Sequence, residues 1–199
     1  MLYGVGLGPG DKELLTLRAL RVIKEADEVI VPGMRAYSLI ADIREPRVVE
    51  FPMGGGAVAA KKLGEELAER CESEDVAFCC LGDPLLYSTF HDTAAEVLKR
   101  NPKVEVRIIP GVTSFSAALA ELGVFVDSSL LVTTADFEDA DVVVVLKATR
   151  PRDIEERLRK KGYKRFMLVE KLFMEGARVL RGEMPERASY FSIVVALRG

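Results

Sequence analysis

Residues 76–81, with the sequence VAFCCL, form an apolar run that stops at Gly82-Asp83-Pro84. Six apolar residues without alternation predict a strand that is buried on both faces, as in a parallel sheet. Pro84 lacks an N–H and disfavours a helical Asp83, whereas Gly82 tolerates unusual dihedral angles. The chain is therefore expected to turn sharply at the carboxyl edge of a sheet, where open α/β sheets bind ligands. The same turn is also typical of a simple strand-to-helix connection.

The first 109 residues alternate between strand and helix patterns. Strands are predicted at residues 2–7, 28–31, 47–51, 76–81 and 104–109, and helices at 11–25, 57–70 and 92–100. This alternation predicts a largely parallel sheet with right-handed crossovers. Asp11 is the predicted N-cap of the first helix, whose apolar face carries Leu15, Ala19 and Val22.

Pro110-Gly111 marks the predicted boundary between an N-terminal domain, residues 1–109, and a C-terminal domain, residues 110–199. Beyond it, helices are predicted at 114–122 and 154–161, and strands at 130–133, 141–147, 166–170, 177–181 and 190–197. The crowding of strands near the C-terminus predicts a mixed sheet with an antiparallel part. The predicted fold class is α/β, with two α/β domains: the first has a mostly parallel sheet and the second a mixed one.

Composition excludes several classes of function. The net charge is −3 and no Lys/Arg-rich block occurs, which gives no electrostatic case for binding nucleic acid. No apolar run approaches the roughly 18 residues of a membrane span, and no signal peptide is recognisable, so a cytoplasmic protein is expected. Cys71, Cys79 and Cys80 form no CxxC pair, and we expect buried thiols and no metal site.

The segment Gly4–Gly10, GVGLGPG, invites comparison with a dinucleotide-binding loop. The G-x-G-x-x-G fingerprint fails, because its last position falls on Pro9 or on Asp11, depending on the glycine at which it begins. Glu28 opens the second strand, where the fingerprint needs an acidic residue at the strand's end to hold a ribose. No Gly-Lys-Ser/Thr occurs, so a phosphate loop is not indicated either. The loop is suited to close packing and to an uncharged or cationic guest.

Three chain breaks follow predicted strands, at Gly8–Gly10, Gly82–Pro84 and Pro110–Ser114, and in a parallel sheet they gather at one edge. The blocks VGLGPGDKELLTLRAL, LGDPLLYSTF and PGVTSFSAALAELG resemble signature motifs of the tetrapyrrole methylases, the class III S-adenosylmethionine-dependent methyltransferases. The spellings YSTF, SFS and the C-terminal YFS resemble the branch that methylates C-20 of precorrin-2 or cobalt-factor II. The resemblance covers nearly the whole chain, although the segment after Pro32 is shorter than is usual in that branch.

This resemblance implies that S-adenosylmethionine binds in the cleft between the two domains and leaves as S-adenosylhomocysteine. Carried over by motif, the cofactor-binding residues would be Pro9, Leu81, Gly82, Asp83, Leu86, Thr113, Ser114, Leu146, Tyr190 and Phe191. Asp83 has an alternative structural role as the cap of the following helix. The family also implies a homodimer and a tetrapyrrole substrate.

A tetrapyrrole bears many carboxylates, and cations near strand ends are candidates to bind them. These are Arg35, Lys147, Arg150 and Arg152, each of which also fits a solvated surface charge. No acid–base pair is evident; Tyr87 is a candidate for substrate contact and His91 for accepting a proton. Methylation at C-20 is the first functional hypothesis. The alternatives are methylation at another ring position or of diphthamide, and a non-catalytic cofactor-binding module. The sequence does not show whether the substrate carries cobalt.

Overall fold

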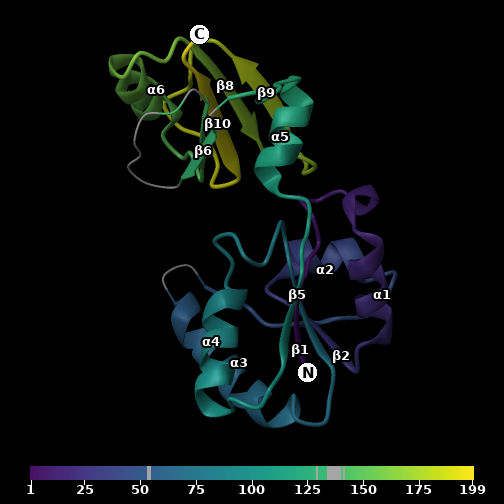
Figure 1. The fold of residues 1–199 in the computed structure, drawn as a ribbon. Coiled ribbons are helices and arrows are strands. Elements are labelled where there is room, and N and C mark those ends of the chain that lie inside the picture. Colours follow the sequence, from purple (N-terminus) through teal and green to yellow (C-terminus); the bar gives the residue numbers. More distant parts are fainter. Residues whose placement is uncertain (53–54, 129, 134–139, 141) are drawn as a thin grey trace. The chain divides into compact units, whose positions relative to one another are not determined.

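The computed structural model describes residues 1–52, 55–128, 130–133, 140 and 142–199. The chain forms two compact units, Met1–Thr113 and Ser114–Gly199 (Figure 1). The boundary between the two units falls between Thr113 and Ser114. Each unit has its own five-stranded sheet.

The N-terminal unit is built on a parallel sheet with the strand order β3-β2-β4-β1-β5. Its strands are β1 (Leu2–Gly6), β2 (Glu28–Val31), β3 (Arg47–Val48), β4 (Val76–Cys80) and β5 (Val106–Ile109). Every residue of β4 is buried, in agreement with its uninterrupted apolar sequence. The strand order places the ends of β4, β1 and β5 next to one another, and these strands precede the three chain breaks.

Helices cover both faces of this sheet (Figure 1). They are α1 (Leu17–Glu25), α2 (Met34–Ile40), α3 (Gly56–Arg70) and α4 (Phe90–Arg100). On one face, α1 and α2 pack their buried side chains against Val5, Val29 and Cys79. On the other face, α3 and α4 pack around Phe78, whose ring lies 5.7 Å from that of Phe90, centroid to centroid.

The first predicted helix is wrong in its N-terminal half. Residues Lys12–Leu14 form a short 3-10 helix, η1, in which the Asp11 carboxylate accepts the Glu13 N–H at 2.9 Å. Leu15 is extended, and α1 begins after Thr16, whose hydroxyl accepts the Ala19 N–H at 3.1 Å. Asp11 therefore caps η1, and Thr16 is the N-cap of α1.

The C-terminal unit has a mixed sheet with the strand order β6-β7-β10-β8-β9. Its strands are β6 (Leu130–Thr133), β7 (Val142–Leu146), β8 (Arg165–Glu170), β9 (Arg178–Arg181) and β10 (Ser192–Leu197). Strands β6 and β7 are parallel, whereas β10 runs antiparallel to β7 and β8, and β9 antiparallel to β8. The end of β7, the end of β8 and the start of β10 therefore lie at the same end of the sheet.

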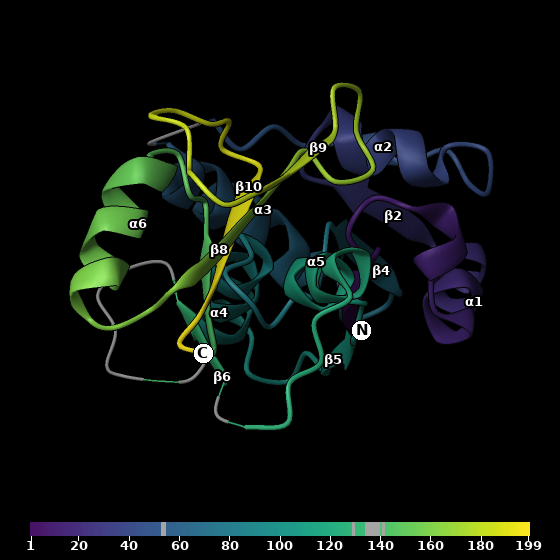
Figure 2. The ribbon, with the colours of Figure 1, turned by 90° about the horizontal axis from the view of Figure 1, so that it is seen from above.

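Two helices sandwich this second sheet, with α5 (Ser114–Leu122) on one face and α6 (Pro151–Lys160) on the other (Figure 2). Alternate residues of β10 face the two helices. Val194 belongs to the core cluster with Leu158 of α6, and Val195 to the cluster with Ala118 of α5. The alternation follows from the two-residue period of a strand.

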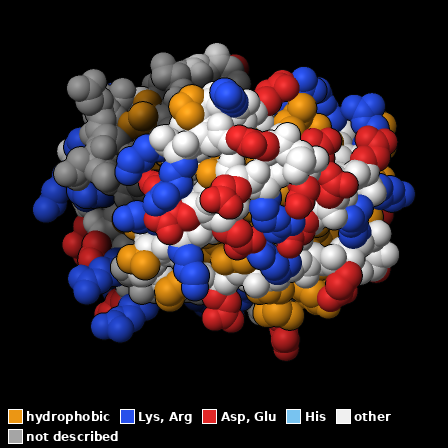
Figure 3. Space-filling view, turned by 90° about the horizontal axis from the view of Figure 1, so that it is seen from below, with side chains coloured by type: hydrophobic (Ala, Val, Ile, Leu, Met, Phe, Trp, Pro, Cys, Tyr) orange, Lys and Arg blue, Asp and Glu red, His pale blue; other side chains and the backbone are white. Residues whose placement is uncertain are grey.

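Acidic and basic side chains are interspersed on the face of the molecule shown in Figure 3. Within the N-terminal unit, the Arg70 guanidinium pairs with Glu28 at 2.7 Å and with Glu66 at 3.1 Å. Among the described residues, no helix has the length and apolar character needed to cross a membrane.

Candidate active site

The loops that follow β1 and β4 are joined by main-chain hydrogen bonds at the carboxyl edge of the N-terminal sheet. The Leu7 N–H donates to the Cys80 carbonyl at 2.8 Å, which extends the ladder past the end of β1. Gly82 donates to the Gly8 carbonyl at 2.7 Å, and Gly8 donates back to Gly82 at 3.3 Å. The glycines have φ angles of 74° and 72°, in the left-handed region that suits glycine. The predicted convergence of these two breaks is confirmed.

The segment after β5, which contains the third break, contacts the same two loops through Gly111. A Cβ atom on Gly6 would lie 2.7 Å from the Gly82 carbonyl oxygen and would overlap the main chain of Gly111. A Cβ atom on Gly111 would lie 2.8 Å from the Gly6 Cα. Three chain segments thus touch through their backbones, which requires residues without side chains.

Asp83 fixes the distance between two of these loops. Its carboxylate accepts the Leu85 N–H at 2.8 Å through Oδ1 and the Gly111 N–H at 3.1 Å through Oδ2. The residue is 9% exposed. The alternative role as a cap of the next helix is wrong, because α4 begins after Thr89. Asp83 instead holds the loop after β4 to the segment after β5.

The main chain at Gly82 is open on the side where a ligand can approach. A Cβ atom on Gly82 would meet nothing within 4 Å, in contrast to Gly6 and Gly111. Leu81 and Gly82 are half-buried, Pro9 is buried and Leu86 is exposed. A pre-formed cradle of this kind lets a small ligand come close to the main chain. Thr113 and Ser114 lie on either side of the unit boundary, and both are half-buried.

Three consecutive large side chains project from the loop after Pro84. Leu85, Leu86 and Tyr87 are 66%, 44% and 53% exposed, and Tyr87 has a φ of 53°. Ser88 anchors the far end of the loop, because its hydroxyl donates to Cys80 Sγ at 3.3 Å. Such strain and exposure are common at functional sites.

Two nucleophilic or basic groups lie near this loop. His91 is exposed in the first turn of α4. Burial raises the pKa of the Cys80 thiol to about 11, so this thiol is protonated at neutral pH. It therefore packs as a small apolar group, in the way the sequence predicted.

In the C-terminal unit, four of the predicted residues gather where β7 ends and β10 begins. Leu146 pairs with Ile193, and the Ala148 N–H donates to the Ser192 carbonyl at 2.9 Å. Lys147, with a φ of 55°, places its ammonium 5.3 Å from the centroid of the Tyr190 ring, and Tyr190 meets Phe191 edge-to-face at 5.4 Å. These four residues are Leu146, Tyr190 and Phe191, which were predicted to bind the cofactor, and Lys147, which was predicted to bind a carboxylate.

A pocket of about 350 Å³ opens beside Lys147. It is lined by Val145, Leu146, Lys147, Thr149, Arg150, Asp153, Ile154 and Arg157. Two of the predicted carboxylate-binding residues, Lys147 and Arg150, thus share one pocket. Arg152 lies outside this lining, and its guanidinium donates to the Met184 carbonyl at 3.2 Å. Arg35 is exposed on α2 of the N-terminal unit. Arg157 also lines this pocket and was not among the residues selected from the sequence.

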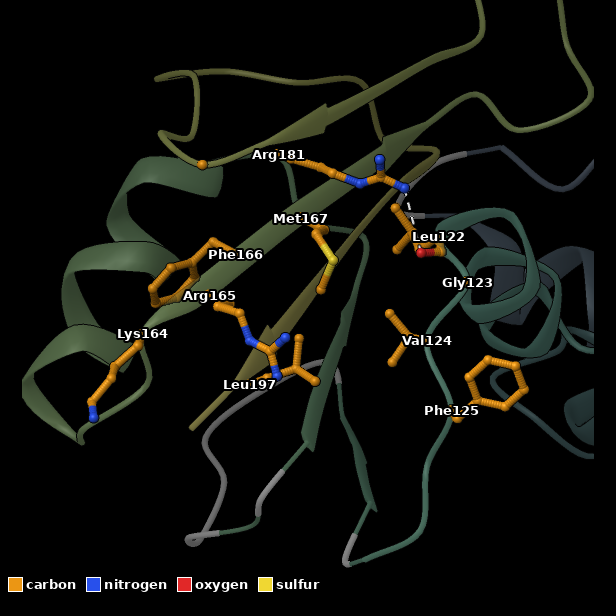
Figure 4. Close-up of a pocket in the computed structure, with 11 residues that line it drawn as sticks. Leu122, Gly123, Val124, Phe125, Lys164, Arg165, Phe166, Met167, Arg181 and Leu197 are labelled. Atoms are coloured by element: carbon orange, nitrogen blue, oxygen red, sulfur yellow. Dashed lines mark hydrogen bonds between the residues drawn. The ribbon is translucent and has the colours of Figure 1, made fainter. Parts of the chain in front are cut away.

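A second cavity of about 570 Å³ lies at the opposite end of the same sheet, where α5 ends and β8 begins (Figure 4). Met167 forms part of its wall, and Arg165 and Arg181 approach it from two sides. None of the predicted site residues lines this cavity.

The geometry can be compared with known proteins. Residues 1–188 match the sequence model described as Tetrapyrrole (Corrin/Porphyrin) Methylases. The chain belongs to this family. It is 31% identical, over 205 residues, to the probable cobalt-precorrin-2 C(20)-methyltransferase of Methanocaldococcus jannaschii, covering 93% of this chain and 88% of that protein. It is 30% identical to the cobalt-precorrin-2 C(20)-methyltransferase of Salmonella typhimurium, covering 73% of this chain and 68% of that protein.

The fold is similarly shared with solved members of the family. Uroporphyrin-III C-methyltransferase of Thermus thermophilus, solved in complex with S-adenosylhomocysteine, superimposes with a TM-score of 0.72 at 21% identity. The match covers 98% of this chain and 96% of that one. Members of the family are S-adenosylmethionine-dependent methyltransferases. The family resemblance and the two-sheet α/β fold predicted from the sequence are confirmed.

Proposed function

We propose that this tetrapyrrole methylase transfers a methyl group from S-adenosylmethionine to C-20 of precorrin-2 or cobalt-factor II in cobalamin biosynthesis. The observation that carries the proposal is the alignment with a probable C(20)-methyltransferase over 93% of the chain. The cradle of three interlocked loops supports the choice of cofactor. The protein is proposed to act in the cytoplasm as a homodimer.

The cofactor is proposed to be held by residues of both units. In the N-terminal unit these are Pro9, Leu81, Gly82, Asp83, Leu86 and Thr113, and in the C-terminal unit Ser114, Leu146, Tyr190 and Phe191. Gly82 exposes its main chain to the ligand, because no side chain or neighbour fills the space beside it. Both carboxylate oxygens of Asp83 accept hydrogen bonds from backbone N–H groups, so its main role is to hold the loops of the cradle in position. When bound, S-adenosylmethionine supplies an electrophilic methyl group on a sulfonium.

Alignment is the main contribution that the chain makes to the reaction. A well-oriented pair of reactants gains roughly 7–11 kcal/mol over the same groups free in solution. The anchored loop 84–88 presents Tyr87 as a contact for the substrate, and Lys147, Arg150 and Arg35 provide cations for its carboxylates. His91 is the candidate proton acceptor, as the first-turn side chain of α4 beside this loop.

The test is single-turnover methylation with isotopically labelled S-adenosylmethionine and either precorrin-2 or cobalt-factor II. We expect a product with one additional methyl group, located at C-20 by NMR. Gly82→Val fills the open space beside the cradle, and we expect it to abolish S-adenosylhomocysteine binding in calorimetry. A methyl group at another ring position would instead indicate that the protein has the activity of a different member of this family. Cofactor binding without turnover on any tetrapyrrole would favour a non-catalytic module.

A further inference from the structure

The described residues that line the pocket beside Lys147 are mostly cationic or apolar. Of these residues, Lys147, Arg150 and Arg157 contribute three positive charges, and Asp153 contributes one negative charge. The apolar part of the wall comes from Val145, Leu146 and Ile154. A pocket of about 350 Å³ with this lining suits a short acidic arm rather than a whole macrocycle.

The helix α6 directs part of this charge into the pocket. Arg150, Ile154 and Arg157 are spaced by four and three residues, so they lie on the same helical face. The helix begins at Pro151, and its N-cap residue, Arg150, makes no side-chain capping hydrogen bond. The positive end of the helix dipole therefore adds to the attraction for an anion.

Among the described residues of the lining, the acidic side chain is Asp153, and it is held weakly. The Arg150 guanidinium lies 3.8 Å from the Asp153 carboxylate, and the two side chains are 72% and 65% exposed. Such exposed pairs contribute little stability, so a ligand carboxylate can replace Asp153 as the partner of Arg150 at little cost.

The position of Lys147 is fixed by the backbone and by its neighbours. Its left-handed conformation continues into a tight turn in which the Thr149 N–H donates to the Lys147 carbonyl at 2.8 Å. The Lys147 ammonium lies near the face of the Tyr190 ring. Leu146, the preceding residue, lines the same pocket. The cationic pocket is thus continuous with residues proposed to contact the cofactor.

The cavity at the other end of the sheet is also lined by cations, Lys164, Arg165 and Arg181 (Figure 4). Two of them bind main-chain carbonyls. Arg181 donates to the Leu122 carbonyl at the end of α5, at 3.4 Å, and Arg165 donates to the Gly199 carbonyl. These guanidinium groups satisfy the ends of a helix and of the chain.

We propose that the pocket beside Lys147 receives one carboxylate-bearing side chain of the tetrapyrrole, and that Arg157 binds this carboxylate together with Lys147 and Arg150. The identity of the ring rests on the proposed function. The assignment of Arg157 and of the pocket rests on the lining and its charge.

The test uses uroporphyrin III, a planar tetrapyrrole polycarboxylate, titrated against the full chain and followed by its fluorescence. We expect Arg157→Gln and Arg150→Gln each to raise the dissociation constant about three- to tenfold, and Arg157→Lys to retain most of the affinity. The matched control is Arg181→Gln, which removes one guanidinium from the cavity at the opposite end of the sheet. It should leave uroporphyrin binding unchanged. The dissociation constant of S-adenosylhomocysteine, measured by calorimetry, should stay within about twofold in all four variants.

The outcomes separate this proposal from the methylation itself. Unchanged uroporphyrin binding in Arg157→Gln, or a loss in Arg181→Gln of equal size, would overturn the pocket assignment even if the wild type methylates C-20. Equal losses for uroporphyrin and S-adenosylhomocysteine would also overturn it, because they would indicate a general structural defect. If the binding data follow the expected pattern but this protein methylates another ring position, the pocket assignment is supported and the proposed reaction is refuted.

Discussion

Gly6 and Gly111 lie where the end of β1 touches the segment after β5, with no room for a side chain on either residue. The atoms in the way are backbone atoms, which cannot swing aside as a flexible side chain would. We therefore expect Gly111→Ala to lower the free energy of unfolding by about 1–3 kcal/mol, a typical cost of overpacking. It should also weaken S-adenosylhomocysteine binding, because the added methyl group would push the segment away from Gly82 and move the N–H of residue 111 out of reach of Asp83. Urea unfolding and calorimetry measure the two effects.

Gly56 provides the control for this substitution. It is the first residue of α3, and a Cβ atom there would meet nothing within 4 Å. Gly56→Ala is expected to leave binding unchanged and to keep or raise stability, since alanine is favoured in helices by up to about 1 kcal/mol. Equal stability of the Gly56 and Gly111 variants would mean that the backbone contact does not constrain the loops.

Single residues also show which parts of the site the sequence could predict. The turn at Gly82 was predictable because glycine and proline act locally on the backbone. The bond from Asp83 to Gly111 joins residues far apart in the chain, so local pattern indicated only a helix cap. Arg157 follows Arg150 by seven residues, but its proposed role depends on where β7 ends beside α6.

Among the elements, the end of β8 organises the segment that leads into β10. Glu170, buried there, accepts the Ser189 N–H at 2.6 Å and the Arg178 Nε–H at 2.5 Å. Burial opposes ionisation, but these hydrogen bonds outweigh it and hold the pKa of Glu170 below its ordinary value of 4.5. A lowered pKa in the folded state stabilises the protein at pH values above that of the unfolded carboxyl. This stability is lost as the pH falls below about 4.5 and through the folded-state pKa.

We expect Glu170→Gln to reduce the unfolding free energy at pH 7 by about 1–3 kcal/mol, because the Ser189 N–H and the Arg178 guanidinium lose a charged, buried acceptor. Between about pH 5 and about pH 3, the unfolding free energy of the variant should also fall less than that of the wild type. Urea unfolding across this range measures both effects. Glu156→Gln, an exposed change on α6, is the control. A pH profile of Glu170→Gln that parallels the wild type would contradict the assigned role.

The elements differ in how clearly the sequence marks them. Strand β4 was predictable because burial on both faces leaves an uninterrupted apolar run. Helix α2 was missed, since it has only seven residues and begins after Gly33, without a side-chain cap. The break at Leu15 was hidden because Asp11 and Thr16 are both good N-cap residues, and the helical pattern of apolar residues runs through the break.

At the scale of the whole molecule, each unit buries its own core on both faces of its own sheet. The proposed cofactor residues are divided between the units, with Gly82 and Asp83 in the first and Leu146 and Tyr190 in the second. A ligand stabilises only those folded states that bind it, by about 2.7 kcal/mol at a concentration one hundred times its dissociation constant. One cofactor that contacts both units should therefore stabilise both.

Hydrogen exchange with and without S-adenosylhomocysteine measures this division directly. We expect slower exchange in peptides that contain residues 81–86 and also in peptides that contain 146–150 and 190–192. Exchange in the outer turns of α3 should change much less, because that helix carries none of the proposed contacts. Gly82→Val should abolish protection in both units together, since the second unit then has no bound cofactor to contact. Protection confined to one unit would mean that the residues assigned in the other unit do not bind the cofactor.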